Sequence, residues 1–171
     1  MQLCPERLEI KPCRGGLALN GQSLLTAHSH FTPHTSSGQP PHVTLLTATE
    51  YKALKRPLPA KIPISLDRIY VLGSASSRRD GKLVQWLVVV WNHADRWRQS
   101  MGLPRKEYHI TLTEENDHGV SKGIGSLFKG MSREDFVDKL MGLGADGIDH
   151  VIVACRDELD LVGVLSYKLA D

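Results

Sequence analysis

The sequence predicts one domain in which helices and strands are mixed, of the α+β or α/β class. Segments rich in β-branched and apolar residues are interspersed with segments of helical periodicity. The chain has 171 residues, 41% of them hydrophobic and 23% charged, which is the composition of an ordinary globular domain. No linker is long enough to divide the chain, so we expect a single domain over residues 1–171 with two lobes at most.

The N-terminal half is predicted to contain loops, a short strand and one helical turn. Residues 24–41 are rich in Ser, Thr, Pro and Gly, which favours loop or turn structure, and residues 14–20 show no clear strand pattern. The segment PHVTLLT, residues 41–47, predicts a strand. Thr49 is expected to cap a helical turn that ends before Pro57.

A β-hairpin is predicted in the middle of the chain. A strand around residues 68–72 leads to Asp80-Gly81, a strong turn signal, and VQWLVVVW supplies the second strand. Asn92 is expected to cap a helix that ends at Gly102. Their apolar or helical surroundings place all three tryptophans in the core: Trp86, Trp91 and Trp97.

The C-terminal part is less regular. YHITLT, residues 108–113, predicts a further strand, while the glycine-rich residues 115–131 predict no defined element. Ser132 is expected to begin a helix over SREDFVDKLMGLG. The tail, residues 149–169, predicts two strands around the acidic turn RDELD, with Cys155 as a small core residue.

Charge is unevenly distributed although the net charge is only +2. Residues 51–82 carry eight basic and two acidic side chains, whereas residues 114–171 carry six basic and twelve acidic ones. This pattern suits a domain that offers a positive face to a phosphate-bearing ligand, and two ordinary solvated faces are the alternative interpretation.

The most informative feature is a tetrapeptide pattern that occurs twice. His42-Val43-Thr44-Leu45 and His109-Ile110-Thr111-Leu112 both have the order His, apolar, Thr, Leu. Successive side chains of a strand face opposite ways, so each histidine shares a face with its threonine while the apolar residues face the other way. If the two strands are neighbours, two imidazoles and two hydroxyls line one cleft.

That group of side chains fits phosphoryl chemistry. An imidazole with a pKa near its ordinary value populates both protonation states around neutral pH, so two opposed histidines can act as general base and general acid. Threonine hydroxyls can donate hydrogen bonds to the non-bridging phosphate oxygens and stabilise the charge that develops on them. This chemistry requires no metal and no other cofactor.

The two motifs resemble those of the 2H phosphoesterases, a family named for paired His-x-Thr/Ser motifs on adjacent strands. The resemblance covers about Leu17–Glu115, and the flanking sequences PPHVTLLT and EYHITLTEEN are similar to the fungal branch associated with RNA-repair proteins, the Swiss Army Knife group. It implies an α+β, two-lobed fold with antiparallel sheets flanking a central cleft.

The resemblance also implies an activity. The expected reaction is metal-independent hydrolysis of a 2′,3′-cyclic phosphate, at an RNA end, on a nucleotide or on an ADP-ribose derivative, to a 2′-phosphate. By resemblance His109 is the base, His42 the acid, and Thr44 and Thr111 hold the phosphate. Other members cut 2′,5′ or 3′,5′ linkages or ligate ends, so the bond stays open. The expected partners are such RNA ends or cyclic nucleotides, together with other RNA-repair domains.

Three further residues are candidates for substrate binding. Lys106, like its neighbour Arg105, lies close enough in sequence to the second motif to reach a phosphate, although an exposed loop pair is the more usual outcome. Lys122 lies in GVSKGIGS, whose backbone amides could cradle an anion. Tyr108 precedes His109, and a regular strand turns it away from the imidazole, which favours packing over stacking on a base.

Two other functions are compatible with the sequence. A noncatalytic nucleotide- or RNA-binding module with the same fold would tolerate loss of both motif histidines and would weaken with salt. A metal-dependent hydrolase would use the cluster His28, His30 and His34, which has no cysteine or carboxylate beside it in the sequence.

The remaining features concern the cellular setting. Cys4, Cys13 and Cys155 lack C-x-x-C spacing and are expected to be reduced thiols. The first residues do not resemble a secretory signal, and no apolar run approaches the length needed to cross a bilayer. We therefore expect the cytoplasm or the nucleus and no membrane partner.

Overall fold

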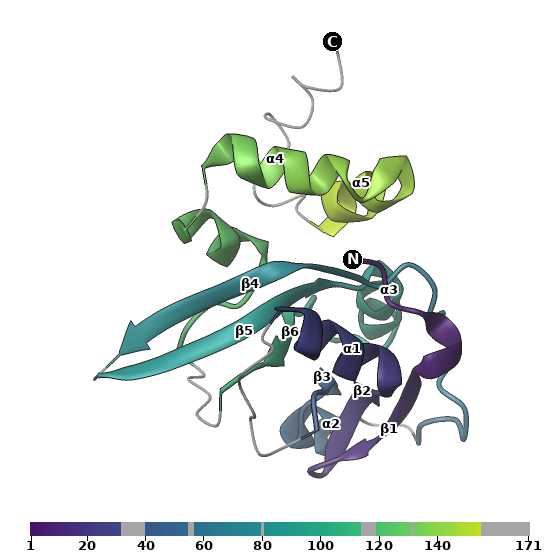
Figure 1. Cartoon of the computed structure of the whole chain (residues 1–171). Coiled ribbons are helices and arrows are strands. Elements are labelled where there is room, and N and C mark those ends of the chain that lie inside the picture. Colours follow the sequence, from purple (N-terminus) through teal and green to yellow (C-terminus); the bar gives the residue numbers. More distant parts are fainter. Residues whose placement is uncertain (32–39, 55–56, 80, 114–118, 131, 155–171) are drawn as a thin grey trace.

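The computed structural model describes residues 1–31, 40–54, 57–79, 81–113, 119–130 and 132–154. These residues form two three-stranded sheets, in the orders β1-β2-β3 and β4-β5-β6, and every pairing within them is antiparallel (Figure 1). Because helices accompany antiparallel rather than parallel strands, the fold is of the α+β class that the resemblance implies.

The strands are β1 (Glu9–Cys13), β2 (Gly16–Asn20), β3 (Val43–Leu46), β4 (Tyr70–Arg79), β5 (Lys82–Val90) and β6 (Tyr108–Thr111). The α-helices are α1 (Gln22–Phe31), α2 (Ala48–Ala53), α3 (Asn92–Ser100), α4 (Arg133–Met141) and α5 (Gly144–Ala154). Two short 3-10 helices are η1 (Pro5–Arg7) and η2 (Ile124–Gly130).

Two predictions for the N-terminal half were wrong. Helix α1 occupies the first part of the segment expected to be loop, because residues 22–31 contain neither Pro nor Gly and bury Leu24 and Ala27 on one helical face. Strand β2 forms where no strand pattern was seen. It is the central strand of its sheet, and Leu17 and Leu19 alternate into the core.

The predicted helical turn before Pro57 exists as α2, but its cap is Thr47 rather than Thr49. The Thr47 hydroxyl accepts a hydrogen bond from the Glu50 N–H (3.2 Å), and the Glu50 carboxylate accepts one from the Thr47 N–H (2.8 Å). This reciprocal capping box needs a carboxylate three residues after the cap. Thr47 has Glu50 at that spacing, whereas Thr49 has Lys52.

The central hairpin is confirmed. Strands β4 and β5 pair over nine positions from Tyr70↔Val90 to Arg79↔Lys82, and Gly81 adopts the positive φ of +77° that the turn requires. Asp80 lies outside the described residues. Helix α3 begins at Asn92 with Trp91 at the cap position, one residue earlier than predicted, and ends at Ser100.

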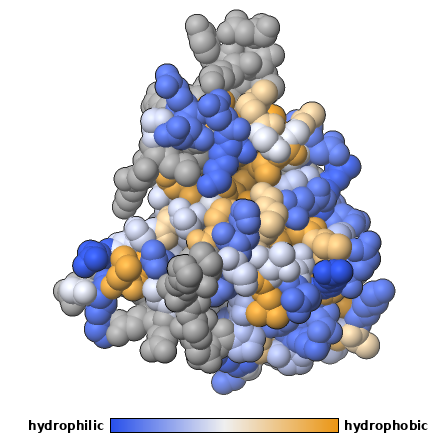
Figure 2. Space-filling model, in the orientation of Figure 1, coloured by the Kyte–Doolittle hydropathy of each residue, from blue (hydrophilic) through white to orange (hydrophobic). Residues whose placement is uncertain are grey.

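Two hydrophobic cores lie on the two faces of the β4–β6 sheet. The first is shared with the β1–β3 sheet, α1 and α3, and the second lies beneath η2, α4 and α5. Figure 1 shows these C-terminal helices on the opposite side of the sheet from β1–β3. In Figure 2 apolar residues are visible where the helical part meets the sheet. The three tryptophans are buried as predicted: Trp86, Trp91 and Trp97.

The C-terminal part contains one confirmed and one wrong prediction. Ser132 caps α4, its hydroxyl accepting the Asp135 N–H (3.1 Å). The strand expected from residue 149 is instead the end of α5, in which Ile148 and Val151 are buried at helical spacing. Packing of this face over the sheet outweighs the β propensity of its branched residues. The expected second strand and Cys155 lie outside the described residues.

None of the helices within the described residues is long and apolar enough to span a membrane.

A buried guanidinium connects the two sheets. The side chain of Arg98 is 1% exposed. It donates hydrogen bonds to the carbonyl oxygens of Leu45 (2.7 Å) and Pro104 (3.0 Å), and its two terminal nitrogens bind the two carboxylate oxygens of Glu50 at 3.2 and 2.6 Å. One side chain on α3 thus holds β3, α2 and the segment that leads into β6.

The carboxylate of Glu50 is ionised in this arrangement. Burial alone would raise the pKa of Glu50, but the hydrogen bond from Arg98, the Thr47 N–H and the charges of Lys106 and Arg98 lower it to about 2. The folded-state pKa is thus below its ordinary value. The pair therefore adds stability that is present above about pH 4.5 and is lost as the pH falls toward 2.

Replacing Arg98 by Met should destabilise the fold strongly. The substitution removes the Arg98 hydrogen bonds to Glu50 and to two backbone carbonyls, and breaking a buried pair in this way costs about 3–5 kcal/mol. Urea unfolding would measure the loss. The matched control is Arg96→Met on the exposed side of the same helix, for which a change within about 0.5 kcal/mol is expected. Similar losses in both variants would contradict the role given to Arg98.

Candidate active site

The first motif follows the predicted alternation of a strand. Val43 and Leu45 are fully buried in the core shared by the two sheets, whereas Thr44 on β3 and His42, the residue before it, are half-buried. Thr44 pairs with Ala18 of β2, and Val43 pairs with Leu19, a member of the shared core. His42 and Thr44 therefore lie on the side of the strand that faces away from this core.

The second motif repeats this arrangement on β6. Ile110 and Leu112 are fully buried in the shared core, and His109 and Thr111 are half-buried. His109 pairs with Val88 of β5, and Thr111 pairs with Trp86. Val88 and Trp86 belong to the second core, so His109 and Thr111 face the side of the sheet on which η2 lies.

The two motifs are brought together although they belong to different sheets. Strand β3 is an edge strand of one sheet, β6 is an edge strand of the other, and the two strands contact each other. Their apolar residues enter the same core. With that core on one side of both strands, the two histidines and two threonines are left on the side away from it.

The two imidazoles are held in the same way. Nδ1 of His42 lies 3.2 Å from the carbonyl oxygen of Pro40, and Nδ1 of His109 lies 3.3 Å from the carbonyl oxygen of Glu107. In each case the partner is the residue two positions earlier in the chain. A carbonyl oxygen only accepts, so each contact is a hydrogen bond when Nδ1 carries the proton, and Nε2 of that imidazole is then the basic nitrogen.

His109 lies in an environment that disfavours its charged form. Burial, followed by the positive charges of Lys122 and Lys106, lowers the pKa of His109 to about 4, against the raising effects of the backbone carbonyl and the carboxylate of Glu107. At neutral pH the imidazole is therefore neutral and its Nε2 is a free base.

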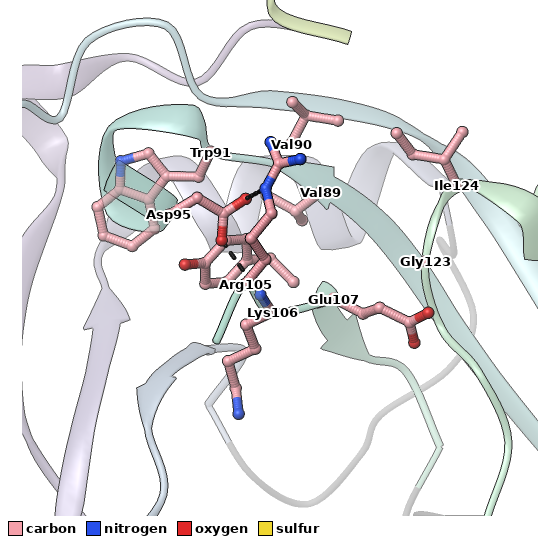
Figure 3. Close-up of a pocket in the computed structure, with 10 residues that line it drawn as sticks. Val89, Val90, Trp91, Asp95, Arg105, Lys106, Glu107, Gly123 and Ile124 are labelled. Atoms are coloured by element: carbon pink, nitrogen blue, oxygen red, sulfur yellow. Dashed lines mark hydrogen bonds and ion pairs between the residues drawn. The ribbon is translucent and has the colours of Figure 1, made fainter. Parts of the chain in front are cut away.

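A pocket of about 190 Å³ adjoins the start of β6. Figure 3 shows Arg105 next to Asp95 on one side and the Glu107 side chain extending toward Gly123 on the other. Lys106 and Tyr108 are among the lining residues, whereas no motif histidine or threonine is among those described. The pocket is thus a neighbour of the motif residues rather than the place where they meet.

The three further candidates have different surroundings. Lys106 forms an ion pair with Glu50 (3.6 Å), and burial lowers the pKa of its ammonium group. Tyr108 is 2% exposed and packs against the Trp91 ring with centroids 5.8 Å apart, as a regular strand predicts. Lys122 is 4% exposed, and its Nζ lies 5.8 Å from the centroid of the Trp86 ring.

Glu107 was missed by the sequence analysis. It lies two residues before His109, and its carboxylate accepts hydrogen bonds from the Ser121 hydroxyl and from the Lys122 N–H, both 2.7 Å long. A single acidic residue between a lysine and a tyrosine gives no pattern that would predict this contact. Only the fold brings residues 121–123 beside the start of β6.

The histidine cluster considered for a metal is only partly described. His28 and His30 lie on α1, and His34 lies outside the described residues. Within the part of the chain that the structure describes, no three His, Cys, Asp or Glu side chains are grouped so that they could hold a metal ion.

Comparison with protein families gives a match at the motifs. Residues 16–118 match the model described as Swiss Army Knife, 2H phosphoesterase domain. The chain belongs to this family. The matched segment contains both motifs of this 2H phosphoesterase. Its bounds are close to those of the segment Leu17–Glu115 that resembles the family. Searches of curated proteins and of solved structures gave no match. Family membership supports phosphoesterase activity, and Lys122 lies beyond the matched segment.

His109 of this 2H phosphoesterase should titrate at unusually low pH. We expect the midpoint of its imidazole resonances near pH 4 rather than near 6.5, because burial and two lysines disfavour the imidazolium. NMR titration of the histidine side chains would measure this, with His109→Gln to assign the signal. A midpoint at or above 6.5 would contradict the environment described for this residue.

Proposed function

We propose that this 2H phosphoesterase hydrolyses a 2′,3′-cyclic phosphate, at an RNA end or on a nucleotide, to a 2′-phosphate without a metal ion. The observation that carries the proposal is a geometry that occurs twice. Each of two contacting strands presents a His and a Thr on the side away from their common core. In both cases Nδ1 of the imidazole lies within hydrogen-bonding distance of a backbone carbonyl oxygen. Family membership supports a phosphoesterase of this kind.

The neutral imidazole of His109 is suited to the base role. Its Nε2 removes a proton from a water molecule as the water oxygen attacks the phosphorus atom. The bond between phosphorus and the ribose 3′ oxygen breaks, and His42, protonated at Nε2, gives its proton to that oxygen. The product is a 2′-phosphate with a free 3′ hydroxyl. Proton exchange of both histidines with solvent then restores their starting forms.

The threonines stabilise charge in this scheme. Hydroxyl groups of Thr44 and Thr111 donate hydrogen bonds to the two non-bridging oxygens, where negative charge increases as the fifth bond to phosphorus forms. Each lies two residues from its histidine, so a strand keeps the hydroxyl on the same face as the imidazole. The spacing of the motif is thus what the reaction needs.

Loss of either histidine should abolish most of the activity. The purified protein is incubated in EDTA with the four 2′,3′-cyclic nucleotides and with a short RNA that ends in a cyclic phosphate, and the products are separated by chromatography. We expect wild type to form 2′-phosphates and His42→Ala and His109→Ala to be about 10²–10⁴-fold slower. His30→Ala, an exposed histidine on α1, is the matched control and should retain full activity.

The same assay separates the alternatives. Thr44→Val and Thr111→Val should each be slower by about 10²-fold, because each removes one donor to the phosphate. Activity lost in EDTA and restored by a divalent ion would exclude the metal-independent mechanism. Binding without turnover that survives both histidine substitutions would identify a noncatalytic nucleotide- or RNA-binding module instead.

A further inference from the structure

We propose that Lys122 binds the phosphate group of the substrate and that Glu107 is the positioning residue that holds Lys122 beside the second motif. The inference rests on the proposed function and adds to it two residues outside both motifs. Lys122 lies beyond residues 16–118, so the phosphate site is completed by a part of the chain that the family match does not cover.

The sheet register places Lys122 over the motif residues. Its ammonium group lies over the ring of Trp86 on β5. Trp86 is the direct partner of Thr111 on β6, and the next residue of β6 on the same face is His109, the partner of Val88. Directly paired residues of antiparallel strands share a face. The ammonium group is thus on the face that carries His109 and Thr111, and its charge acts on His109.

Two sets of contacts fix the segment that carries Lys122. On one side the Glu107 carboxylate binds the Ser121 hydroxyl and the Lys122 N–H, both at 2.7 Å. On the other side the Ser126 hydroxyl donates to the Gly123 carbonyl oxygen (2.7 Å) and accepts from Trp86 Nε1 (3.2 Å). The lysine backbone is therefore tied both to the start of β6 and to the tryptophan beneath its own side chain.

Gly123 shows how close the Glu107 contact is. A Cβ at this position would lie 2.7 Å from Oε1 of Glu107 and 3.0 Å from its carboxyl carbon. A side chain at position 123 would therefore push the carboxylate away from Ser121 and Lys122. The close approach is possible because residue 123 is glycine.

A lysine in this place has a chemical use in the reaction. It brings a full positive charge to a phosphate that becomes more negative in the transition state, where each threonine offers only a hydroxyl dipole. Of the other charged groups that act on His109, Glu107 is bound to the 121–122 segment and Lys106 is paired with Glu50. Lys122 is placed to meet the phosphate because its ammonium group lies over Trp86, the direct partner of Thr111, and Lys106 serves as the comparison.

The first test compares Lys122→Met with Lys106→Met on 2′,3′-cyclic AMP, and measures binding of adenosine 2′-monophosphate by calorimetry. We expect Lys122→Met to raise KM and to weaken binding of the monophosphate at least tenfold, with a smaller effect of Lys106→Met. Removing the Lys122 charge should also raise the NMR midpoint of His109, because that charge disfavours the imidazolium. Lys122→Arg, which keeps the charge, should retain most of the binding.

The second test isolates Glu107. Glu107→Ala removes both acceptors and should reproduce the raised KM of Lys122→Met. Glu107→Gln keeps an acceptor for the Lys122 N–H and should remain within about threefold of wild type in KM. If Glu107 has a purely structural role, both variants should unfold at a lower temperature than wild type, and Glu107→Ala and Glu107→Gln should not differ in KM.

The outcomes separate this inference from the proposed function. The inference would be overturned if wild type turns over the substrate while Lys122→Met and Lys122→Arg both stay within twofold of wild type in KM and in monophosphate binding. That result would leave the proposed function intact. Absence of both turnover and monophosphate binding in wild type would overturn the two together. If Lys122→Met does not fold, Lys122→Gln gives the same comparison with a polar side chain.

Discussion

The guanidinium of Arg98 joins segments of the two sheets by specific hydrogen bonds. It is almost fully buried on α3 and binds a carbonyl on β3, a carbonyl before β6 and the carboxylate of Glu50 on α2. Hydrophobic contact between the sheets is not directional, so by itself it allows one sheet to slide against the other. Donors fixed in one planar guanidinium bind β3 and the segment that leads into β6, and thereby remove that freedom.

The position of the motifs follows from this junction. Each motif is a strand at the edge of its own sheet, and the apolar residues of both enter one core. The polar residues of both are then left on the opposite side. Each imidazole is oriented by the backbone two residues before it, so its direction depends on the strand rather than on a distant side chain. The same local geometry is used twice, so both imidazoles have the same orientation relative to their own strands.

The site also depends on residues far from the motifs in sequence. Glu107 contacts the segment of Lys122, and Lys122 affects the imidazole of His109. The C-terminal helices η2, α4 and α5 cover the second core and thereby bring this segment over β5 and β6. The segment from residue 121 to the end of α5 thus contributes to the environment of the second histidine, in addition to covering the sheet.

The sequence by itself determined the two strands of the motifs, the hairpin between them and the alternation that separates polar from apolar residues, because these depend on neighbours within a few positions. It misplaced α1 and α5. Local composition favoured loop in one and strand in the other, and burial of one helical face decided both. Thr49 rather than Thr47 was predicted as the cap of α2, although the sequence contains the capping-box pattern Thr47-x-x-Glu50. The contact of β3 with β6, the burial of Arg98, the Glu107 contact and the low pKa of His109 were decided by tertiary structure alone. Each requires residues separated by long stretches of chain to meet in a low-dielectric interior, which no local pattern encodes.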